Sequence, residues 1–223
     1  MESTEPGTTK ELTSYILNKG LDGVRPLSSA TYLAEQYLID QSYSSNEQRV
    51  KALINWETSK NFTTGFITGL GGVITMPISI PSAVGASWIL QARMSGAIAR
   101  IYGHDLTDDR VRTFILLSLA GDSTNELLKA GGIEVGKKLT QRAIAQIPGR
   151  MLIELNKAIG ARLATKACDR GFVNLTKSVP LTGGLIGGLF DATTCRIAGR
   201  TAQKLFKTPE TGNPNPEPLF LFP

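Results

Sequence analysis

Cysteine and histidine are scarce in this 223-residue chain, which contains Cys168, Cys195 and a single histidine, His104. The first ten residues are polar and lack the apolar run of a secretory signal. We therefore expect two reduced, buried thiols rather than a disulfide. The two cysteines do not show zinc-ligand spacing, so the sequence gives no reason to expect a metal. No cofactor is expected either.

Signals for β-strands are also missing, because the chain has no alternating Val/Ile/Thr runs and no Asn-Gly hairpins. Apolar residues recur instead at helical spacing, as Val50, Leu53 and Ile54 do. The sequence predicts an all-α protein, a single multi-helix bundle-like domain over residues 28–206. An N-terminal helix and linker (1–27) precede it, and a flexible Pro-rich tail (207–223) follows. We expect the first helix to end at Gly20, and Ser28 or Ser29 to cap the second.

Charged residues are absent from a stretch of 32 residues, 61–92. About 20 helical residues cross a bilayer, so this stretch is long enough for one span. Pro77 and Pro81 break it, however, and its many Thr, Ser and Gly residues lower its hydropathy. Three interpretations stay open: a buried helical hairpin, a re-entrant or conditionally inserting hairpin, and a constitutive span.

Glycines at intervals of three or four residues mark two segments. The first set lies within the charge-free stretch and the second lies between residues 179 and 190: Gly65, Gly69 and Gly72, then Gly183, Gly184, Gly187 and Gly188. Such spacing places small residues on one helix face, where another backbone can approach closely. We expect these two glycine stripes to pack on each other at the centre of the bundle.

Positive charge is concentrated in the second half of the chain. Residues 129–207 contain 14 Lys/Arg and 4 Asp/Glu, whereas residues 1–128 contain 10 and 13. A basic surface favours polyanions, and the near-absence of aromatic residues here argues against nucleic acid and for an anionic lipid surface. An ordinary solvated basic face is the alternative. The residues expected to contact lipid are Lys137, Lys138, Arg142, Lys157, Arg162 and Lys166.

Two groups of residues are candidates for chemistry. The first group could together hold a cation or activate a water; it consists of His104, Asp105, Asp108 and Asp109. The same segment would equally suit the start of a helix. Asp105 or Thr107 would then be the cap, and Asp108 and Asp109 would lie in the first turn. Asp191 follows 13 uncharged residues, where a carboxylate needs a partner. We expect a buried ion pair between Asp191 and Arg93, with a catalytic Asp191 as the alternative.

Five segments, in the same order, resemble the EcsC family of bacterial proteins: residues 65–81, 91–105, 132–139, 155–166 and 178–191. Their features include Gly-Leu-Gly-Gly followed by two prolines, and a later Tyr-Gly. The resemblance covers most of residues 28–206. It implies an all-helical, cytoplasmic, bacterial protein, and it specifies no reaction.

No serine elbow, HExxH motif, Walker loop or dinucleotide fingerprint is present, so the sequence favours a non-enzymatic protein. We expect a membrane-peripheral protein of the bacterial cytoplasm, located at the inner membrane. Its basic C-terminal half would bind anionic lipid or a membrane-protein partner. The alternatives are a hydrolase or peptidase that uses the His104–Asp109 cluster, and a membrane-inserting effector.

Overall fold

A computed structural model of the chain describes residues 9–69, 83–133, 144–175 and 180–207. Within these ranges the protein consists of helices and connecting turns, which confirms the all-α prediction. The helices are α1 (Thr9–Asp22), α2 (Ala30–Ile39), α3 (Asn46–Gly69), α4 (Ala83–Ile101), α5 (Asp109–Ala120), the 3-10 helix η1 (Gly121–Ser123), α6 (Thr124–Ala130), α8 (Gly149–Leu175) and α9 (Pro180–Phe206).

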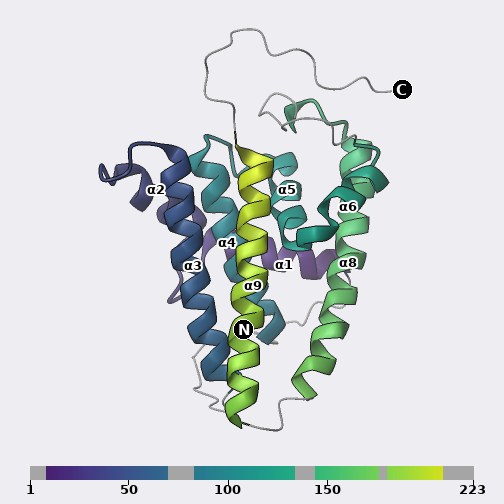
Figure 1. Cartoon of the computed structure of the whole chain (residues 1–223). Helices are drawn as coiled ribbons and strands as arrows, with labels where there is room; N and C mark the ends of the chain where they lie inside the picture. The colour runs from purple at the N-terminus through teal and green to yellow at the C-terminus, as the bar shows by residue number, and fades with distance from the viewer. Residues whose placement is uncertain (1–8, 70–82, 134–143, 176–179, 208–223) are drawn as a thin grey trace.

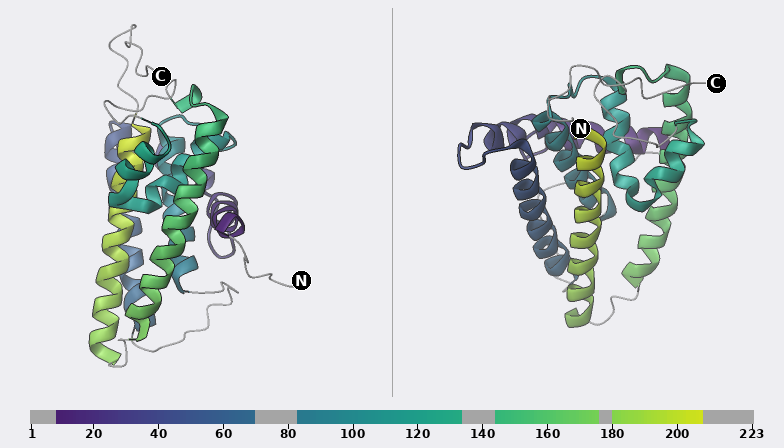
Figure 2. Two further views of the ribbon diagram at one scale, coloured as in Figure 1. Left: turned by 90° about the vertical axis from the view of Figure 1, so that its right-hand side faces the viewer. Right: turned by 45° about the horizontal axis from the view of Figure 1, so that its top comes forward.

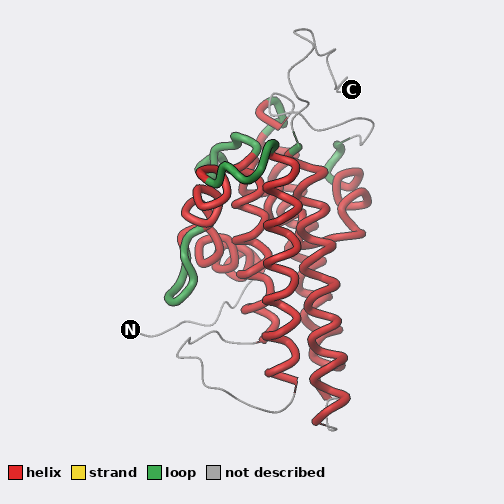
Figure 3. Tube along the Cα trace, turned by 60° about the vertical axis from the view of Figure 1, so that its left-hand side comes forward, coloured by secondary structure: helices red, strands yellow, loops and turns green. Residues whose placement is uncertain are grey.

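The long helices α3, α8 and α9 run along one axis of the molecule, and α1 crosses behind them (Figures 1 and 2). Helix α9 packs against α3, α4 and α5, while α4 also packs against α1 and α2. Helix α8 packs against α5, α6 and α1. The trace in Figure 3 shows the short helices and loops gathered towards one end of this bundle.

The core is centred on α4 and α5. Residues 91–99 of α4 and 113–120 of α5 are buried on every side, as expected for helices enclosed by others. The largest fully buried side chains include Trp88, Phe114, Phe206, Leu53 and Met94. Cys195 lies in the same core as a free thiol, as predicted, whereas the Cys168 side chain lies outside the described residues.

The helix ends differ in part from the expectations. Ser29 caps α2 by accepting a hydrogen bond from the Tyr32 amide, whereas Ser28 contacts Arg93. Helix α1 continues through Gly20 to Asp22, so the prediction that it ends at Gly20 is wrong. The left-handed residue after α1 is Gly23, with φ of 85°. Gly20 is instead the point where α1 crosses α4 closely.

Helices α3 and α9 are antiparallel, and two contacts fix their register. Lys207 binds Glu47, and Gly199 packs against Ile54. The predicted glycines occupy the last turns of α3 (Gly65, Gly69) and the first turns of α9 (Gly183, Gly184, Gly187, Gly188), while Gly72 lies outside the described residues. These segments lie at the lower end of the bundle in Figure 1, not at its centre.

Candidate functional site

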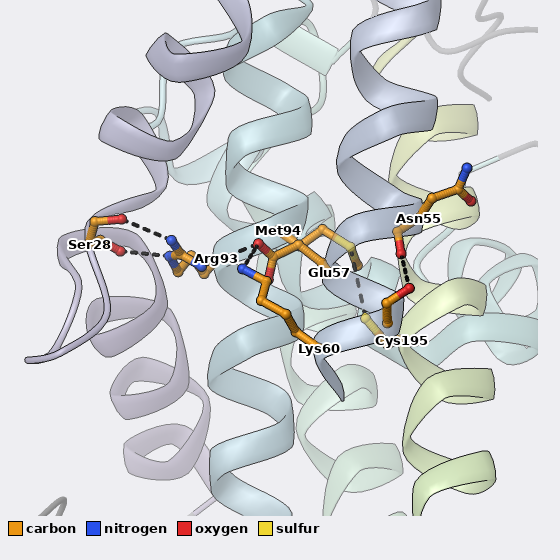
Figure 4. A network of polar contacts seen from close by, with 8 residues as sticks. Ser28, Asn55, Glu57, Lys60, Arg93, Met94 and Cys195 are labelled. Carbon is orange, nitrogen blue, oxygen red and sulfur yellow. Dashed lines mark hydrogen bonds and ion pairs between the residues drawn. The ribbon is translucent and has the colours of Figure 1, made fainter. Parts of the chain in front are cut away.

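A charged network lies inside the bundle, around Arg93 of α4. Its guanidinium donates from Nε to the Ser28 carbonyl oxygen at 2.7 Å and from Nη2 to the Ser28 hydroxyl at 2.8 Å. Nη1 lies 3.6 Å from Oε1 of Glu57. Figure 4 shows Arg93 between Ser28 and Glu57. The Arg93 and Glu57 side chains are only 7% and 1% exposed, so this ion pair is almost fully removed from water.

Glu57 is shared by two cations. Its Oε1 also accepts from Nζ of Lys60 at 2.6 Å, one helical turn further along α3. Lys60 is 43% exposed, so the network extends from the core to the surface. Burial, and secondly the negative charge of Glu57, raise the pKa of the nearby Tyr37 phenol to about 12. Tyr37 therefore stays neutral at physiological pH.

The predicted partner of Arg93 was Asp191. The structure corrects this prediction, because Arg93 forms its ion pair with Glu57. Asp191 lies on α9, where it is half-buried and its backbone carbonyl accepts from the Thr194 hydroxyl. Glu57 could have been found in the sequence, because it lies seven residues after Val50 and four after Leu53, on the apolar face of α3. A carboxylate on such a face signals a buried partner.

A second polar contact connects α4 to α9 near this network. Nε2 of Gln91 donates to the Ser87 hydroxyl at 3.0 Å and to the Thr194 hydroxyl at 3.4 Å. Cys195 lies beside it, with its sulfur 3.9 Å from that of Met94. Burial, followed by the charge of Glu57, raises the pKa of the Cys195 thiol to about 12. This cysteine is therefore protonated and unsuited to nucleophilic attack.

The His104–Asp109 cluster is used for capping and packing. Asp108 is the N-cap of α5 and accepts from the Arg110 amide at 2.8 Å, so the predicted caps, Asp105 and Thr107, are corrected to Asp108. Asp105 accepts from both the amide and the hydroxyl of Thr107. Asp109 is exposed in the first turn of α5. Over the described ranges, no three His, Cys, Asp or Glu side chains are grouped to hold a metal.

His104 itself is buried at the C-terminal end of α9. Its Nε2 lies 3.0 Å from the Phe206 carbonyl oxygen, which can only accept, so the neutral ring carries its proton on Nε2. Nδ1 is buried and has no hydrogen-bond partner among the residues described. Desolvation by burial lowers the pKa of His104, against a smaller opposing effect of the Phe206 carbonyl. The ring thus acts as a neutral packing element against Phe206.

Acidification should destabilise the protein through His104. Because the folded-state pKa lies below the ordinary value of 6.5, the unfolded chain binds the proton first. The contribution of His104 is therefore fully present above pH 6.5 and is lost as the pH falls below it, by at most about 1.4 kcal/mol per pH unit. Urea unfolding at pH 7 and pH 5 measures this loss. The variant His104→Gln keeps a donor for the Phe206 carbonyl but cannot titrate, so its loss of stability between pH 7 and pH 5 should be smaller. Equal losses in the wild type and the variant would show that His104 does not cause the acid destabilisation.

The basic residues predicted to bind lipid have different surroundings. Lys157 of α8 is exposed and pairs with Glu154 at 3.0 Å, and Arg162 is exposed and donates to the Ser123 hydroxyl at 3.0 Å. The side chain of Lys166 lies outside the described residues, as do Lys137, Lys138 and Arg142. The structure therefore describes only Lys157 and Arg162 of this set.

A second basic surface, which the sequence prediction did not include, lies on α9. Arg196, Arg200 and Lys204 are all exposed and are spaced four residues apart, so they form one row along the helix. No carboxylate in the described part of the chain lies within 4 Å of this α9 cation row. The spacing was visible in the sequence, but which face of α9 is exposed depends on its packing against α3 and α4.

The described helices and the comparisons with known proteins bear on membrane crossing and on the family of this chain. None of these helices combines the length and the apolar character needed to cross a bilayer. Neither the curated proteins nor the solved structures give a match. The model of the EcsC protein family matches residues 21–208, which is most of the chain. The protein therefore belongs to the EcsC family.

Proposed function

We propose that this protein binds peripherally to an anionic membrane surface, and that the α9 cation row makes the contact. The observation that carries the proposal is the row itself: three exposed cations, about 6 Å apart along one helix face, without a carboxylate within ion-pair distance among the described residues. Cations that pair within their own protein gain little from lipid, as for Lys157 beside Glu154. Those of the α9 row have no such carboxylate partner in the described part of the chain, which favours their binding to phosphate headgroups.

The magnitude of the attraction is sufficient for reversible binding. Each Lys or Arg close to an anionic leaflet contributes about 1 kcal/mol at physiological salt, so three contribute about 3 kcal/mol. That corresponds to a change of roughly 100-fold in the partition constant. Anionic lipid is abundant on the cytoplasmic leaflet, so the proposal places the protein on the cytoplasmic face of the inner membrane.

The test compares two triple variants that remove the same net charge. Arg196→Gln/Arg200→Gln/Lys204→Gln removes the α9 cation row, and Lys157→Gln/Arg162→Gln/Lys166→Gln removes cations of α8. Binding is measured by co-flotation with phosphatidylglycerol/phosphatidylcholine vesicles in low salt. We expect the α9 variant to bind roughly 100-fold more weakly than the wild type, and the α8 variant to lose much less.

Two outcomes would overturn the proposal. If both variants lose binding equally, net charge and not the α9 cation row governs association. If the wild type does not float with anionic vesicles at low salt, the protein has no affinity for such a surface.

A further inference from the structure

The α9 cation row lies beside the interface between α9 and α3. Gly199 contacts Ile54 in this interface, and Lys207 binds Glu47 at its end. Helix α4 packs against both helices and so covers the inner side of the interface. Exposed residues next to the interface therefore lie on its outer side, where α3 and α9 run side by side in Figures 1 and 2.

Helix α3 contributes a fourth cation to this outer side. Lys51 lies four residues after Glu47 and three before Ile54, two α3 residues that contact α9, and its side chain is exposed. It therefore lies at the edge of α3 next to α9. Glu47 is engaged by Lys207 at 2.7 Å, and no carboxylate within the described ranges lies within 4 Å of Lys51.

The antiparallel register gives the height of each α3 residue along α9. The two contacts across the interface place Lys51 about level with residue 202 of α9. Asn55, one turn further along α3, is about level with residue 198 and is also exposed. Figure 4 shows the Asn55 side chain directed away from the buried ion pair of α3 and α4.

These two side chains lie opposite the two gaps of the α9 cation row. The first gap separates Arg196 from Arg200, and Asn55 is level with its centre. The second gap separates Arg200 from Lys204, and Lys51 is level with its centre. Each gap is thus bordered by two cations of α9 and by one hydrogen-bond donor of α3, an arrangement that suits one phosphate in each gap.

A lipid with two phosphates matches this spacing. The gap centres are four residues apart on α9, which is about 6 Å. In diphosphatidylglycerol the two phosphorus atoms are joined through a glycerol by six bonds of about 1.5 Å each, so bent conformations place them at a similar distance. Phosphatidylglycerol has one phosphodiester, and two separate molecules must be held to fill both gaps. A lipid that contains both phosphates fills the second gap intramolecularly, at a lower cost in entropy.

We propose that the outer side of the α3–α9 interface is a headgroup site for diphosphatidylglycerol, with one phosphate in each gap of the α9 cation row and Lys51 and Asn55 as the α3 contacts. This inference rests on the membrane binding proposed above and adds the class of lipid and two further residues. Helix α9 then lies along the membrane surface, which brings all three cations of its row to the headgroups.

Vesicles of equal surface charge separate headgroup recognition from general attraction. Diphosphatidylglycerol is compared with twice the molar amount of phosphatidylglycerol, each diluted in phosphatidylcholine, and binding of the full-length protein is measured by co-flotation. General attraction predicts equal binding to the two kinds of vesicle, since it depends on surface charge. The site predicts binding roughly three- to tenfold tighter to diphosphatidylglycerol.

A single lysine substitution tests the contribution of α3. In Lys51→Gln the preference for diphosphatidylglycerol over phosphatidylglycerol should fall below about twofold, because the second gap loses its third cation or donor of fixed charge. The matched control is Lys129→Gln on α6, a helix that packs against α5 and α8; Lys129 is also exposed. This control loses the same charge and should keep the full preference. Both lysines are exposed, so neither substitution disturbs the core.

Chemical protection locates the bound lipid without a mutation. Diphosphatidylglycerol vesicles should slow the acetylation of Lys51 by an amine-reactive reagent, followed by mass spectrometry, and should leave Lys129 reactive. Equal modification of Lys51 with and without these vesicles would overturn the site.

The outcomes distinguish the two proposals. Equal binding of the wild type to the two kinds of vesicle, or a preference that survives Lys51→Gln, would overturn the diphosphatidylglycerol site and leave peripheral binding in place. Absence of flotation with either kind of vesicle at low salt would remove both proposals.

Discussion

Replacement of Glu57 by alanine is expected to lower the free energy of unfolding by about 3–5 kcal/mol. The substitution leaves the Arg93 guanidinium buried at 7% exposure without its carboxylate, 3.6 Å away in the wild type. Two hydrogen bonds to Ser28 remain, but they are dipolar partners and do not neutralise the charge. Chemical unfolding followed by circular dichroism at neutral pH measures the loss.

Two controls identify the buried pair as the cause. In Glu57→Met/Arg93→Met both charges are removed and the buried side-chain volume is largely kept, so most of the stability should return. Glu154→Ala breaks the exposed pair with Lys157 and should change the free energy of unfolding by no more than about 0.5 kcal/mol. A Glu57→Ala variant as stable as Glu154→Ala would show that the Arg93–Glu57 contact contributes nothing.

Introduction of leucine at Gly20 is expected to cost about 3 kcal/mol. A Cβ atom at this position would lie 2.8 Å from the Ala92 Cβ and 3.0 Å from the Ile89 carbonyl oxygen. The carbonyl belongs to the backbone of α4 and cannot rotate away, so α1 must move from its place on the core. Leucine is a good helix former, and the expected loss therefore comes from packing and not from helix propensity.

The same experiment has an internal control in alanine. Gly→Ala in an open helical position stabilises by up to about 1 kcal/mol, but Gly20→Ala should destabilise because of the same contacts. Gly149, where an added Cβ would meet nothing within 4 Å, should accept alanine without loss. A thermal melt of Gly20→Ala equal to or above that of the wild type would show that α1 does not depend on this crossing.

The helical architecture could be predicted from the sequence because the signals that specify helices are local. Periodic apolar residues predicted the helices, and the serine before Ala30 predicted a cap that Ser29 provides. Gly20 was misjudged because a glycine at a helix end and a glycine at a helix crossing look alike along one chain. Only the approach of α4 shows which of the two it is.

The candidate sites depended more on tertiary structure. The sequence predicted a buried ion pair for Arg93 but gave it Asp191 as the partner, whereas packing of α3 on α4 places Glu57 beside Arg93. The α9 cation row was overlooked because charge alone does not show which cations are already paired. Asp108 was placed one residue too far into α5, since neighbouring aspartates can each cap a helix.

Co-flotation of the wild-type protein with vesicles of defined charge tests the proposal of membrane binding most directly. We predict binding to vesicles that contain phosphatidylglycerol and little binding to phosphatidylcholine alone. High salt should release the protein, because the α9 cation row binds the surface through its charge. A protein that stays with the soluble fraction at low salt, whatever the vesicle composition, would contradict it.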